Sequence, residues 1–454
     1  MSSSDDWKGL RVVVLGLARS GVAVAKLLHD LGAKVTVNDR KPRSECPEAE
    51  ALEKLGVPVI CGGHPVDLIH DRVNLLVKNP GIPYTAPPVQ SAITKGIPVV
   101  TEVEIAYRIT KAPVIGITGS NGKTTTTTLV GRMLAAGDVP SQVAGNIGRA
   151  LAEVAPGMGA EEWLVAELSS FQLKGVNTFR PRIGALLNIV PAHLDYHGDL
   201  VDYTESKEKL FMNQRTEDIA VLNRDSSACR AAAEKISSNI LWFSRRERVS
   251  QGVFIEGDRV IARLPGKPEW ELMPVSEMRL PGVHQENGLA AAAIALAAGC
   301  PAEAVRRELS AFTGVEHRLE FVTEKRGVRW YNDSKATNAK AAVSAMDSFT
   351  EPVILIAGGL DRGVEFPELI PVFGRRLKGI VTYGQTADIL IARAKEAGVP
   401  HRLRVNDVKE AVGAAASMAG KGDIVLLSPA CASWDQYTSF EERGSIFKQA
   451  VHNL

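Results

Sequence analysis

Short apolar runs rich in valine and isoleucine recur along this chain of 454 residues, each closed by glycine or a polar residue and followed by a stretch of helical character. Strands that alternate with helices predict parallel sheets with helices on both faces. The runs that predict strands are 11–15, 34–37, 73–77, 114–117, 163–166, 183–187, 353–357, 379–382 and 423–427. Ligands in such folds bind at the carboxyl ends of strands, which is where the unusual residues of this chain lie.

Three blocks of alternating strands and helices predict three domains, with limits at 1–111, 112–313 and 314–454. The length agrees, because one domain usually has about 100–200 residues. Residues 244–279 are rich in arginine and then alternate apolar and polar side chains, which predicts a surface hairpin without chemistry. The third block follows two predicted helices, at 287–298 and 303–311.

The composition is that of a soluble globular protein, with 45% hydrophobic and 23% charged residues. Lysine and arginine (53) nearly cancel aspartate and glutamate (52), so no overall field attracts nucleic acid or a membrane. The acidic start MSSSDDWKGL is not a signal peptide, and no run approaches the roughly 20 apolar residues of a membrane helix. The cysteines form no CxxC pair and are expected to be reduced thiols: Cys46, Cys61, Cys229, Cys300 and Cys431. We therefore expect a cytoplasmic enzyme.

The segment TGSNGKTT at 118–125 follows a predicted strand and opens a helix. Its glycines let backbone N–H groups converge on a phosphate, and the helix N-terminus adds partial positive charge. Lys123 can then reach the terminal phosphates, and Thr124 can coordinate magnesium. A strict P-loop has glycine or alanine where this chain has Ile117, so the loop is a variant. The pattern predicts an ATP site.

A second glycine-containing loop, 16–21, follows the first predicted strand, although it is not GxGxxG. Asp39 lies at the end of the second predicted strand and is followed by Arg40. In Rossmann folds an acidic residue near this place binds the ribose, so Asp39 favours a nucleotide site. A nucleotide and a dinucleotide are both open at this point, and so is a simple tight turn.

Two further strand ends carry candidate metal ligands. Glu167 closes the run 163–166, where a carboxylate suits magnesium beside the phosphate loop or caps the following helix. His193 follows the run 183–187, and its open roles are metal ligand, base or ordinary polar group.

The third block carries chemistry at three strand ends. Asp333 and Lys335 lie two apart in NDSKATN and would face one ligand, although Ser334 and Thr337 could instead cap a helix there. In GGLDRG, Arg362 can clamp a carboxylate in bidentate fashion. In SPACAS, small residues allow close backbone approach, and Cys431 as a nucleophile has no paired histidine.

The motifs TGSNGKTT, GNIG, ELSSFQL, HLDYHG, EHRLE, NDSKATN, GGLDRG and SPACASWDQ, in this order, resemble the Mur ligases over nearly the whole chain. NDSKATN with SPACAS is specific to the branch that adds D-glutamate to UDP-N-acetylmuramoyl-L-alanine. The branches that add alanine, diaminopimelate or a dipeptide, and folylpolyglutamate synthetase, share mainly the loop and metal residues. The resemblance implies three α/β domains, each with a mainly parallel sheet flanked by helices: Rossmann-like, P-loop-type and Rossmann-like.

The resemblance also implies site residues, motif by motif. The UDP sugar nucleotide, not a dinucleotide, would be held through Arg19, Ser20, Asp39, Arg40, Asn79, Gly81 and Asn146. ATP would be held through Gly119, Ser120, Asn121, Gly122, Lys123, Thr124, Thr125, Asn287, Arg318, Asp333 and Lys335. D-glutamate would be positioned by Thr337, Arg362, Ser433 and Phe440. The catalytic set would be Lys123, Glu167, His193 and Lys207.

Two Mg²⁺ ions are implied, one held by Thr124 and Glu167, the other by His193 and Lys207. Lys207 matches the family's carbamylated lysine. An ammonium cannot ligate magnesium, whereas reaction with CO2 gives an anionic oxygen ligand. On sequence alone, a lysine on a surface helix is the alternative.

Three positions depart from the family pattern. The family's HNxxN is one residue shorter here, His284-Gln285-Glu286-Asn287, and one deleted helical residue turns a side chain by about 100°. An adenine contact by Asn287 is therefore in question. Ala192 precedes His193, where the family usually has an acidic residue. Arg362 replaces a lysine that many relatives have; it keeps the positive charge and carries it on a planar guanidinium group.

The implied reaction is attack of the muramoyl-alanine carboxylate on the ATP γ-phosphate, followed by attack of the D-glutamate amine on the acyl phosphate. It would form an amide bond of the peptidoglycan precursor, in a monomer, and so serve cell wall biogenesis, cell shape and cell division.

Three alternatives belong to other classes or branches. An oxidoreductase would use 16–21 for NAD but lacks GxGxxG. A P-loop NTPase module or motor would need an apolar run ending in Asp, whereas WLVAE ends in Glu167. A related ligase that adds a different amino acid is the nearest rival.

Overall fold

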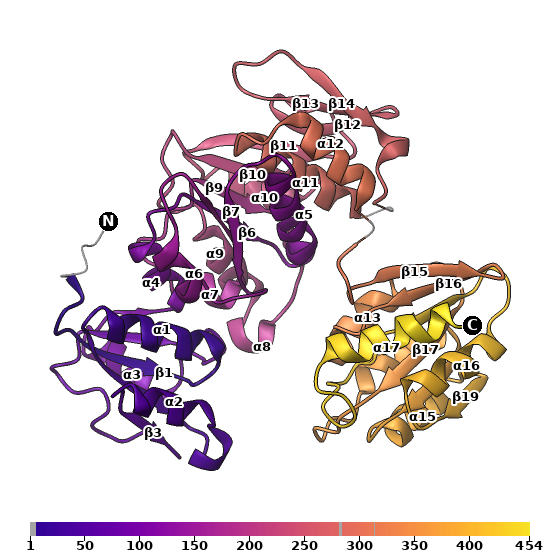
Figure 1. Cartoon of the computed structure of the whole chain (residues 1–454), viewed down its shortest axis with the longest axis horizontal. Helices are drawn as coiled ribbons and strands as arrows, with labels where there is room; N and C mark the ends of the chain where they lie inside the picture. The colour runs from indigo at the N-terminus through magenta and orange to yellow at the C-terminus, as the bar shows by residue number, and fades with distance from the viewer. Residues whose placement is uncertain (1–5, 281–283, 313) are drawn as a thin grey trace. The chain divides into compact units, whose positions relative to one another are not determined.

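The computed structural model describes residues 6–280, 284–312 and 314–454, and these form three β-sheets flanked by helices (Figure 1). The chain divides into two compact units, Met1–Phe312 and Thr313–Leu454. The first unit contains two of the sheets and the second contains the third. No helix in the described part of the chain is both long and apolar enough to cross a membrane.

The N-terminal sheet has five parallel strands in the order β3-β2-β1-β4-β5 within residues 6–111. Alternate residues of β1 enter different cores, Val12 and Val14 on one face and Val13 and Leu15 on the other, because side chains alternate along a strand. The strands are β1 (Arg11–Leu15), β2 (Lys34–Asp39), β3 (Val59–Cys61), β4 (Leu75–Lys78) and β5 (Val99–Val100). The helices are α1 (Arg19–Asp30), α2 (Glu48–Lys54), α3 (Pro87–Thr94) and α4 (Glu102–Ile109).

The central sheet has nine strands, counted over the described residues, in the order β14-β13-β12-β11-β10-β9-β6-β8-β7. The strands from β7 to β12 run parallel, and β12, β13 and β14 are antiparallel. The strands are β6 (Val114–Thr118), β7 (Ser141–Gly145), β8 (Trp163–Glu167), β9 (Ile183–Leu186), β10 (Ile219–Asn223), β11 (Asn239–Ser244), β12 (Gly252–Glu256), β13 (Arg259–Arg263) and β14 (Trp270–Pro274). The predicted hairpin at 244–279 therefore exists, but it extends the central sheet.

Helices of the central domain lie between and over these strands (Figure 1). They are α5 (Lys123–Ala136), α6 (Leu151–Val154), α7 (Ser170–Lys174), α8 (Leu194–His197), α9 (Leu200–Glu208), α10 (Ser227–Ala233), α11 (His284–Ala297) and α12 (Ala302–Ala311). The helix α11 is rich in alanine and buried from Asn287 to Leu296, and it packs along α5. A helix that is apolar all round belongs in a core, and small side chains let it approach its neighbour closely.

The C-terminal sheet has six strands among residues 314–454, in the order β15-β16-β20-β17-β18-β19. All neighbours are parallel except the β15–β16 hairpin. The strands are β15 (Glu320–Lys325), β16 (Val328–Asn332), β17 (Val353–Gly358), β18 (Leu377–Tyr383), β19 (His401–Arg404) and β20 (Ile424–Leu427). The helices are α13 (Ala339–Met346), α14 (Ile370–Arg376), α15 (Ala387–Glu396), α16 (Val408–Met418) and α17 (Phe440–His452).

The predicted fold class is confirmed: the domains are α/β, with mainly parallel sheets covered by helices. Each of the nine predicted runs is a strand whose ends lie within two residues of the prediction. The prediction omitted several strands, among them the exposed edge strand β19, HRLR, whose residues carry no apolar run. What places the site is the order of the strands, because β6 lies between β8 and β9 and brings their carboxyl ends together.

Candidate active site

The phosphate loop lies at the carboxyl end of β6 and leads directly into α5. Gly122 is the N-cap of α5 with φ of 82°, a left-handed conformation that glycine adopts without strain. Gly119 lies against β9, since a Cβ there would be 3.0 Å from the Cβ of Leu187. The loop thus has the backbone shape and helix N-terminus that an anionic phosphate requires.

Residues from the end of β9 hold this loop in place. The backbone N–H of Ser120 donates to the carbonyl of Asn188 (3.0 Å), and that of Asn121 donates to the Asn188 side chain (2.9 Å). The Ser120 hydroxyl hydrogen bonds with the Tyr203 hydroxyl (2.9 Å) from α9. Sequence reasoning had given Asn188 and Tyr203 no role, because these contacts join positions more than 60 residues apart.

Lys123 is the first residue of α5, and its ammonium lies over the loop. Its Nζ donates to the carbonyls of Gly119 (2.8 Å) and Ser120 (3.1 Å). The positive charge is therefore held where the terminal phosphates of a bound nucleotide would lie.

Glu167 ends β8 and is buried, with 1% of its surface exposed. One carboxylate oxygen accepts a hydrogen bond from the Asn146 side chain (2.9 Å). The other, Oε2, is buried and has no hydrogen-bond partner among the described residues. The following helix α7 is capped by Ser169 with Gln172 in a capping box, so Glu167 is not its cap. A buried carboxylate oxygen without a donor fits a bound Mg²⁺.

Lys207, on α9, is 1% exposed, so the alternative of a surface lysine is wrong. Its Nζ donates to the carbonyl of Gly119 (2.9 Å) and lies 3.4 Å from the Thr118 hydroxyl. It also lies 4.7 Å from the centre of the Tyr203 ring. Burial first, and then the nearby charge of Lys123, hold the pKa of Lys207 well below its usual range.

His193 precedes the short helix α8 in a left-handed conformation, with φ of 56°. Its exposed ring meets the edge of Phe171 at 5.0 Å between centroids, and Tyr203 lies 6.5 Å away. The neighbouring Ala192 supplies no carboxylate. Over the described residues no three His, Cys, Asp or Glu side chains cluster as a metal site. The predicted magnesium set therefore requires hydroxyl, carbamate or phosphate oxygens in addition to Glu167 and His193.

Asn287 remains beside the phosphate loop despite the shortened motif. Its side-chain oxygen lies against Gly122, in the space that a Cβ on this glycine would occupy. Asn287 lies in the first turn of the described helix, which begins at His284. The residues from Asn287 to Leu296 are buried, so packing of these turns against the core fixes the rotation of α11. Contact between Asn287 and ATP stays a prediction.

In the N-terminal domain the strand ends bring together Ser20, Asp39 and Asn79. The Ser20 hydroxyl donates to the Asn79 side chain (3.3 Å), and the Asp39 carboxylate accepts from the backbone of Leu17 (2.8 Å). A Cβ at Gly16 would lie 2.8 Å from that of Asn79, so the first loop packs on the fourth strand end. The other predicted residues at these strand ends are exposed: Arg19, Arg40 and Gly81.

In the C-terminal domain Asp333 follows β16 and is 7% exposed. It accepts hydrogen bonds from the Ser428 hydroxyl (2.9 Å) and the Leu319 N–H (3.1 Å). Burial raises the pKa of Asp333 to about 7, although these bonds and the charge of Arg318 oppose the rise. Lys335 lies 5.6 Å from the centre of the Phe440 ring.

The predicted D-glutamate residues follow the adjacent strands β16, β20 and β17 or begin α17. Arg362 lies over the Trp434 ring (5.1 Å), and the hydroxyl of Ser433 is buried without a hydrogen-bond partner among the described residues. Neither Ser334 nor Thr337 caps α13, because Asn338 does so through the N–H of Ala341.

Arg443 of α17, which sequence reasoning missed, ties these loops together. It is fully buried, and its guanidinium donates to the hydroxyl and carbonyl of Ser334 (2.9 and 2.8 Å) and to the carbonyl of Cys431 (3.2 Å). The carbonyl of Gly358 lies 3.5 Å away. Burial raises the pKa of the Cys431 thiol to about 11, which argues against this residue as a nucleophile.

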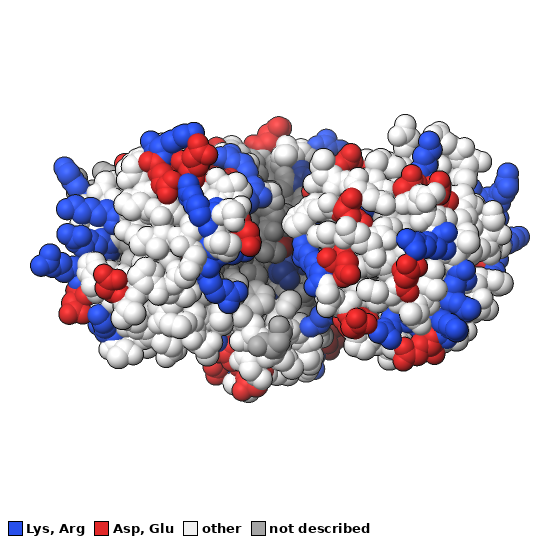
Figure 2. Space-filling view, turned by 90° about the horizontal axis from the view of Figure 1, so that it is seen from below, with Lys and Arg blue, Asp and Glu red and all other residues white. Residues whose placement is uncertain are grey.

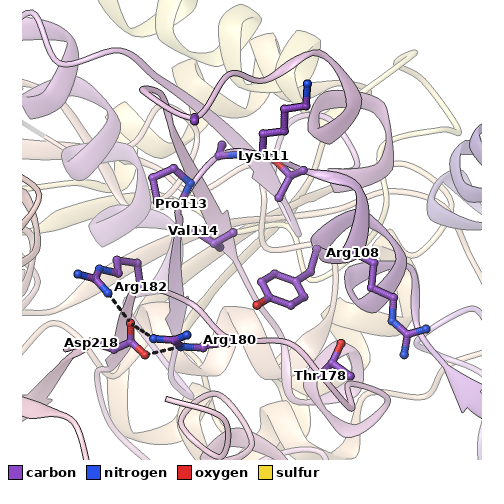
Figure 3. A pocket seen from close by; sticks show the side chains of 12 residues that line it. Arg108, Lys111, Pro113, Val114, Thr178, Arg180, Arg182 and Asp218 are labelled. Atoms are coloured by element: carbon purple, nitrogen blue, oxygen red, sulfur yellow. Dashed lines mark hydrogen bonds and ion pairs between the residues drawn. The ribbon is translucent and has the colours of Figure 1, made fainter. Parts of the chain in front are cut away.

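A pocket of about 560 Å³ lies at the amino end of β6, opposite the phosphate loop (Figure 3). Its arginines are paired internally: Arg180 and Arg182 bind Asp218 at 2.6 and 3.2 Å, and Arg108 binds Glu104 at 2.9 Å. On the molecular face of Figure 2, basic and acidic side chains are likewise mixed. With its arginines already paired, this pocket is a weaker candidate for an anion-binding site than the phosphate loop at the carboxyl end of β6.

Comparison with known families assigns the chain to a class. Three family descriptions match it: "Mur ligase MurD-like, N-terminal domain" over residues 10–101, "Mur ligase middle domain" over 117–296 and "Mur ligase, glutamate ligase domain" over 317–431. Together with the full-length relatives below, these matches show that the chain belongs to the Mur ligase family.

Within that family the chain is similar to enzymes named UDP-N-acetylmuramoylalanine–D-glutamate ligase. It is 50% identical to the one from Geobacillus sp. (strain WCH70) over 446 residues, 98% of each chain. It is 47% identical to the one from Bacillus subtilis (strain 168) over 444 residues, 97% of each chain. The family resemblance inferred from the motifs is thereby confirmed.

Solved structures of the family share the fold. The MurF ligase from Thermotoga maritima in complex with ADP matches with a TM-score of 0.55 at 18% identity, covering 100% of this chain and 97% of that one. The UDP-N-acetylmuramate–alanine ligase MurC of the same organism matches with a TM-score of 0.53 at 18% identity, covering 98% and 99%.

Substitution of Gly122 by alanine is expected to weaken ATP binding at least about tenfold. The new Cβ would overlap the Asn287 side chain, and a left-handed conformation costs a non-glycine residue about 1–2 kcal/mol. Titration calorimetry with ATP measures the effect. The control is Gly257→Ala, which has φ of 63° and open space around it, and therefore carries the backbone strain alone. Equal ATP affinity in G122A and G257A would contradict the assigned geometry.

Asp333→Asn is expected to gain stability relative to the native chain as the pH rises from about 4 to about 7, and to level off above that. The folded-state pKa of Asp333 is raised, so the native chain loses stability across this window while the amide does not titrate. The difference should reach at most about 4 kcal/mol. Melting temperatures of both proteins from pH 4 to 9 test it, and parallel profiles would refute it.

Proposed function

We propose that this chain is an ATP-dependent ligase that joins D-glutamate to UDP-N-acetylmuramoyl-L-alanine through an amide bond, in the synthesis of the peptidoglycan precursor. The observation that carries the proposal is the identity of about half of all positions, over 98% of the chain, with relatives of that name. The phosphate loop with Lys123 and the buried Glu167 supports it independently of the names.

In this proposal each of the three domains, with limits at 1–111, 112–313 and 314–454, binds a different substrate. The first domain binds the UDP sugar nucleotide, and the clustering of Ser20, Asp39 and Asn79 at adjacent strand ends supports that role. The predicted contacts of Arg19, Arg40, Gly81 and Asn146 with the same substrate belong to the proposal as well.

The central domain binds ATP in this proposal, with the backbone N–H groups of 119–125 on the phosphates and Asn287 beside them. Thr124 and Glu167 would hold one Mg²⁺, which when bound neutralises phosphate charge. Lys123 adds a fixed positive charge where two anions, carboxylate and γ-phosphate, must approach.

Lys207 would hold a second Mg²⁺ with His193 after it has become a carbamate. The surroundings support this: the amine is buried, it lies near a second lysine, and its pKa is depressed, so it is available as a neutral nucleophile. Nitrogen bonds to the carbon of CO2, and one proton is released, which leaves an anionic oxygen ligand in place of a cation.

The reaction would proceed in two transfers. A carboxylate oxygen of the muramoyl-alanine attacks the γ-phosphorus while the bond to ADP breaks, giving an acyl phosphate. The amine of D-glutamate then attacks the acyl carbon, phosphate leaves and the amine loses a proton. The C-terminal residues Arg318, Asp333 and Lys335 for ATP, and Thr337, Arg362, Ser433 and Phe440 for D-glutamate, are the contacts assigned to that domain.

A related ligase that adds a different amino acid is the second candidate, because the loop and metal residues serve every branch. Arg362 and Ser433 at neighbouring strand ends favour an acidic amino acid. We further propose a monomer located in the cytoplasm, with no nucleic-acid or membrane partner.

The assay that tests the function combines ATP, Mg²⁺ and UDP-N-acetylmuramoyl-L-alanine with single amino acids. Phosphate release is expected with D-glutamate and at most a background rate with L-glutamate, meso-diaminopimelate or L-alanine. Phosphate release at an equal rate with meso-diaminopimelate, or without any amino acid, would contradict the proposed specificity for D-glutamate.

Removal of CO2 tests the carbamate. Ligase activity is expected to fall in degassed, bicarbonate-free buffer and to return when bicarbonate is added, because the carbamate forms reversibly. A ¹³C NMR signal from ¹³CO2-treated protein should be absent in Lys207→Arg, which keeps a basic side chain but has no amine. An unchanged rate without CO2, together with no carbamate signal, would contradict the assignment.

A further inference from the structure

A lysine at the end of β4, Lys78, is buried in a way that the proposed reaction does not explain. Only 1% of its surface is exposed. Its Nζ donates to Ile82 O (2.9 Å), Tyr196 Oη (3.1 Å), Pro80 O (3.2 Å) and Asn79 O (3.4 Å). These partners are carbonyls and a phenol, without a carboxylate. Burial, and then the charge of Lys174, lower the pKa of Lys78 to about 7.

The three carbonyl acceptors belong to the short loop 79–82, which carries Asn79 and Gly81, both assigned above to the UDP substrate. Lys78 binds three carbonyls of this loop, so the path of the loop depends on one ammonium group. Tyr196 binds the same loop, because its hydroxyl donates to the carbonyl of Pro80 (3.1 Å) or of Ile82 (3.2 Å). The loop is thus fixed jointly by a residue of the first domain and one of the second.

Tyr196 belongs to α8, the helix that follows His193. Its ring meets the edge of Phe171 at 4.5 Å, and Phe171 meets His193 at 5.0 Å. A helix of four residues is too short to be stable alone, so its position comes from its side-chain anchors. Among the described side chains of α8, His197 is another anchor: it hydrogen bonds with the Ser170 hydroxyl (3.0 Å) and with Asp202 (2.6 Å).

A second lysine, Lys174, faces the same aromatic rings. It lies 5.2 Å from the Tyr84 centroid and 5.9 Å from that of Tyr196, and Lys78 lies 4.7 Å from Tyr84. Lys174 is neutralised by Asp202 (2.6 Å), whereas the described partners of Lys78 include no acid. The ring faces stabilise a cation in place of water, which lets the ammonium of Lys78 stay buried at the junction.

We propose that Lys78 and Tyr196 are positioning residues that couple binding of the UDP substrate at loop 79–82 to the placement of His193. The proposal rests on the proposed function for the roles of the loop and of His193. A ligand that fixes the loop also fixes the Tyr196 hydroxyl, and through Phe171 and α8 it fixes the histidine. Thermodynamic linkage makes this effect reciprocal. Bound UDP substrate raises the affinity of the second domain for Mg²⁺ and nucleotide, and bound Mg²⁺ and nucleotide raise the affinity for the UDP substrate by the same factor.

Titration calorimetry of UDP-N-acetylmuramoyl-L-alanine, with and without Mg²⁺ and a non-hydrolysable ATP analogue, measures this coupling. The native chain should bind the acceptor more tightly in their presence. Tyr196→Phe, which removes only the hydroxyl, and Lys78→Met should each remove most of that gain. In the assay Tyr196→Phe should raise the Mg²⁺ concentration for half-maximal rate by about tenfold, with the KM for D-glutamate unchanged.

Tyr84→Phe is the matched control, because its ring faces the same two lysines and its hydroxyl makes none of the hydrogen bonds described for the loop. It should keep the native coupling. The double variant K78M/Y196F should lose no more coupling than either single variant, since both act on one element.

The outcomes separate this proposal from the function it rests on. Native coupling in Y196F, or an equal loss for acceptor, Mg²⁺ and D-glutamate together with a lower melting temperature, would overturn it. Failure of the native chain to ligate D-glutamate would refute the proposed function, while the calorimetric comparison of native chain, Y196F and Y84F would still decide the coupling.

Discussion

One carbonyl group, that of Gly119, receives two lysine side chains. Lys123 reaches it from α5 at 2.8 Å and Lys207 from α9 at 2.9 Å. Two ammonium groups so near one another repel, and one of them is buried. The arrangement is stable if Lys207 gives up its proton, and it becomes attractive if Lys207 is converted to an anion. The phosphate loop and α9 are therefore joined by an electrostatic constraint, which a neutral or anionic Lys207 satisfies and a protonated one does not.

The fold could be predicted from the sequence because its main signal is local. Runs such as 114–117 and 353–357 are buried on both faces of a parallel sheet, and such strands are continuous apolar stretches. The strand β19 could not be found in this way, because HRLR is exposed and pairs only at the edge. The role of residues 244–279 was also missed in part, since a hairpin pattern does not tell which sheet it extends.

The site was predictable where a motif carries its own geometry, as in the loop around Gly122, and less so where distant segments meet. Asn188, Tyr203, Lys78 and Arg443 act on groups 67, 83, 118 and 109 positions away. A single sequence holds no signal for such pairs. Lys207 is the intermediate case: the family resemblance indicated its role, while its residue type on a polar helix suggested the surface. Burial, which only the fold supplies, excludes the surface lysine, while the role that the resemblance implies stays a prediction.

Arg443 binds mainly to the backbone of the neighbouring loops and less to their side chains. Three of its four acceptors are main-chain carbonyls, of Ser334, Gly358 and Cys431, which every amino acid possesses. The loops after β16, β17 and β20 can therefore exchange their side chains while the anchor beneath them is kept. Substitutions on these loops can therefore change the chemical groups that they present without altering the main-chain hydrogen bonds of Arg443.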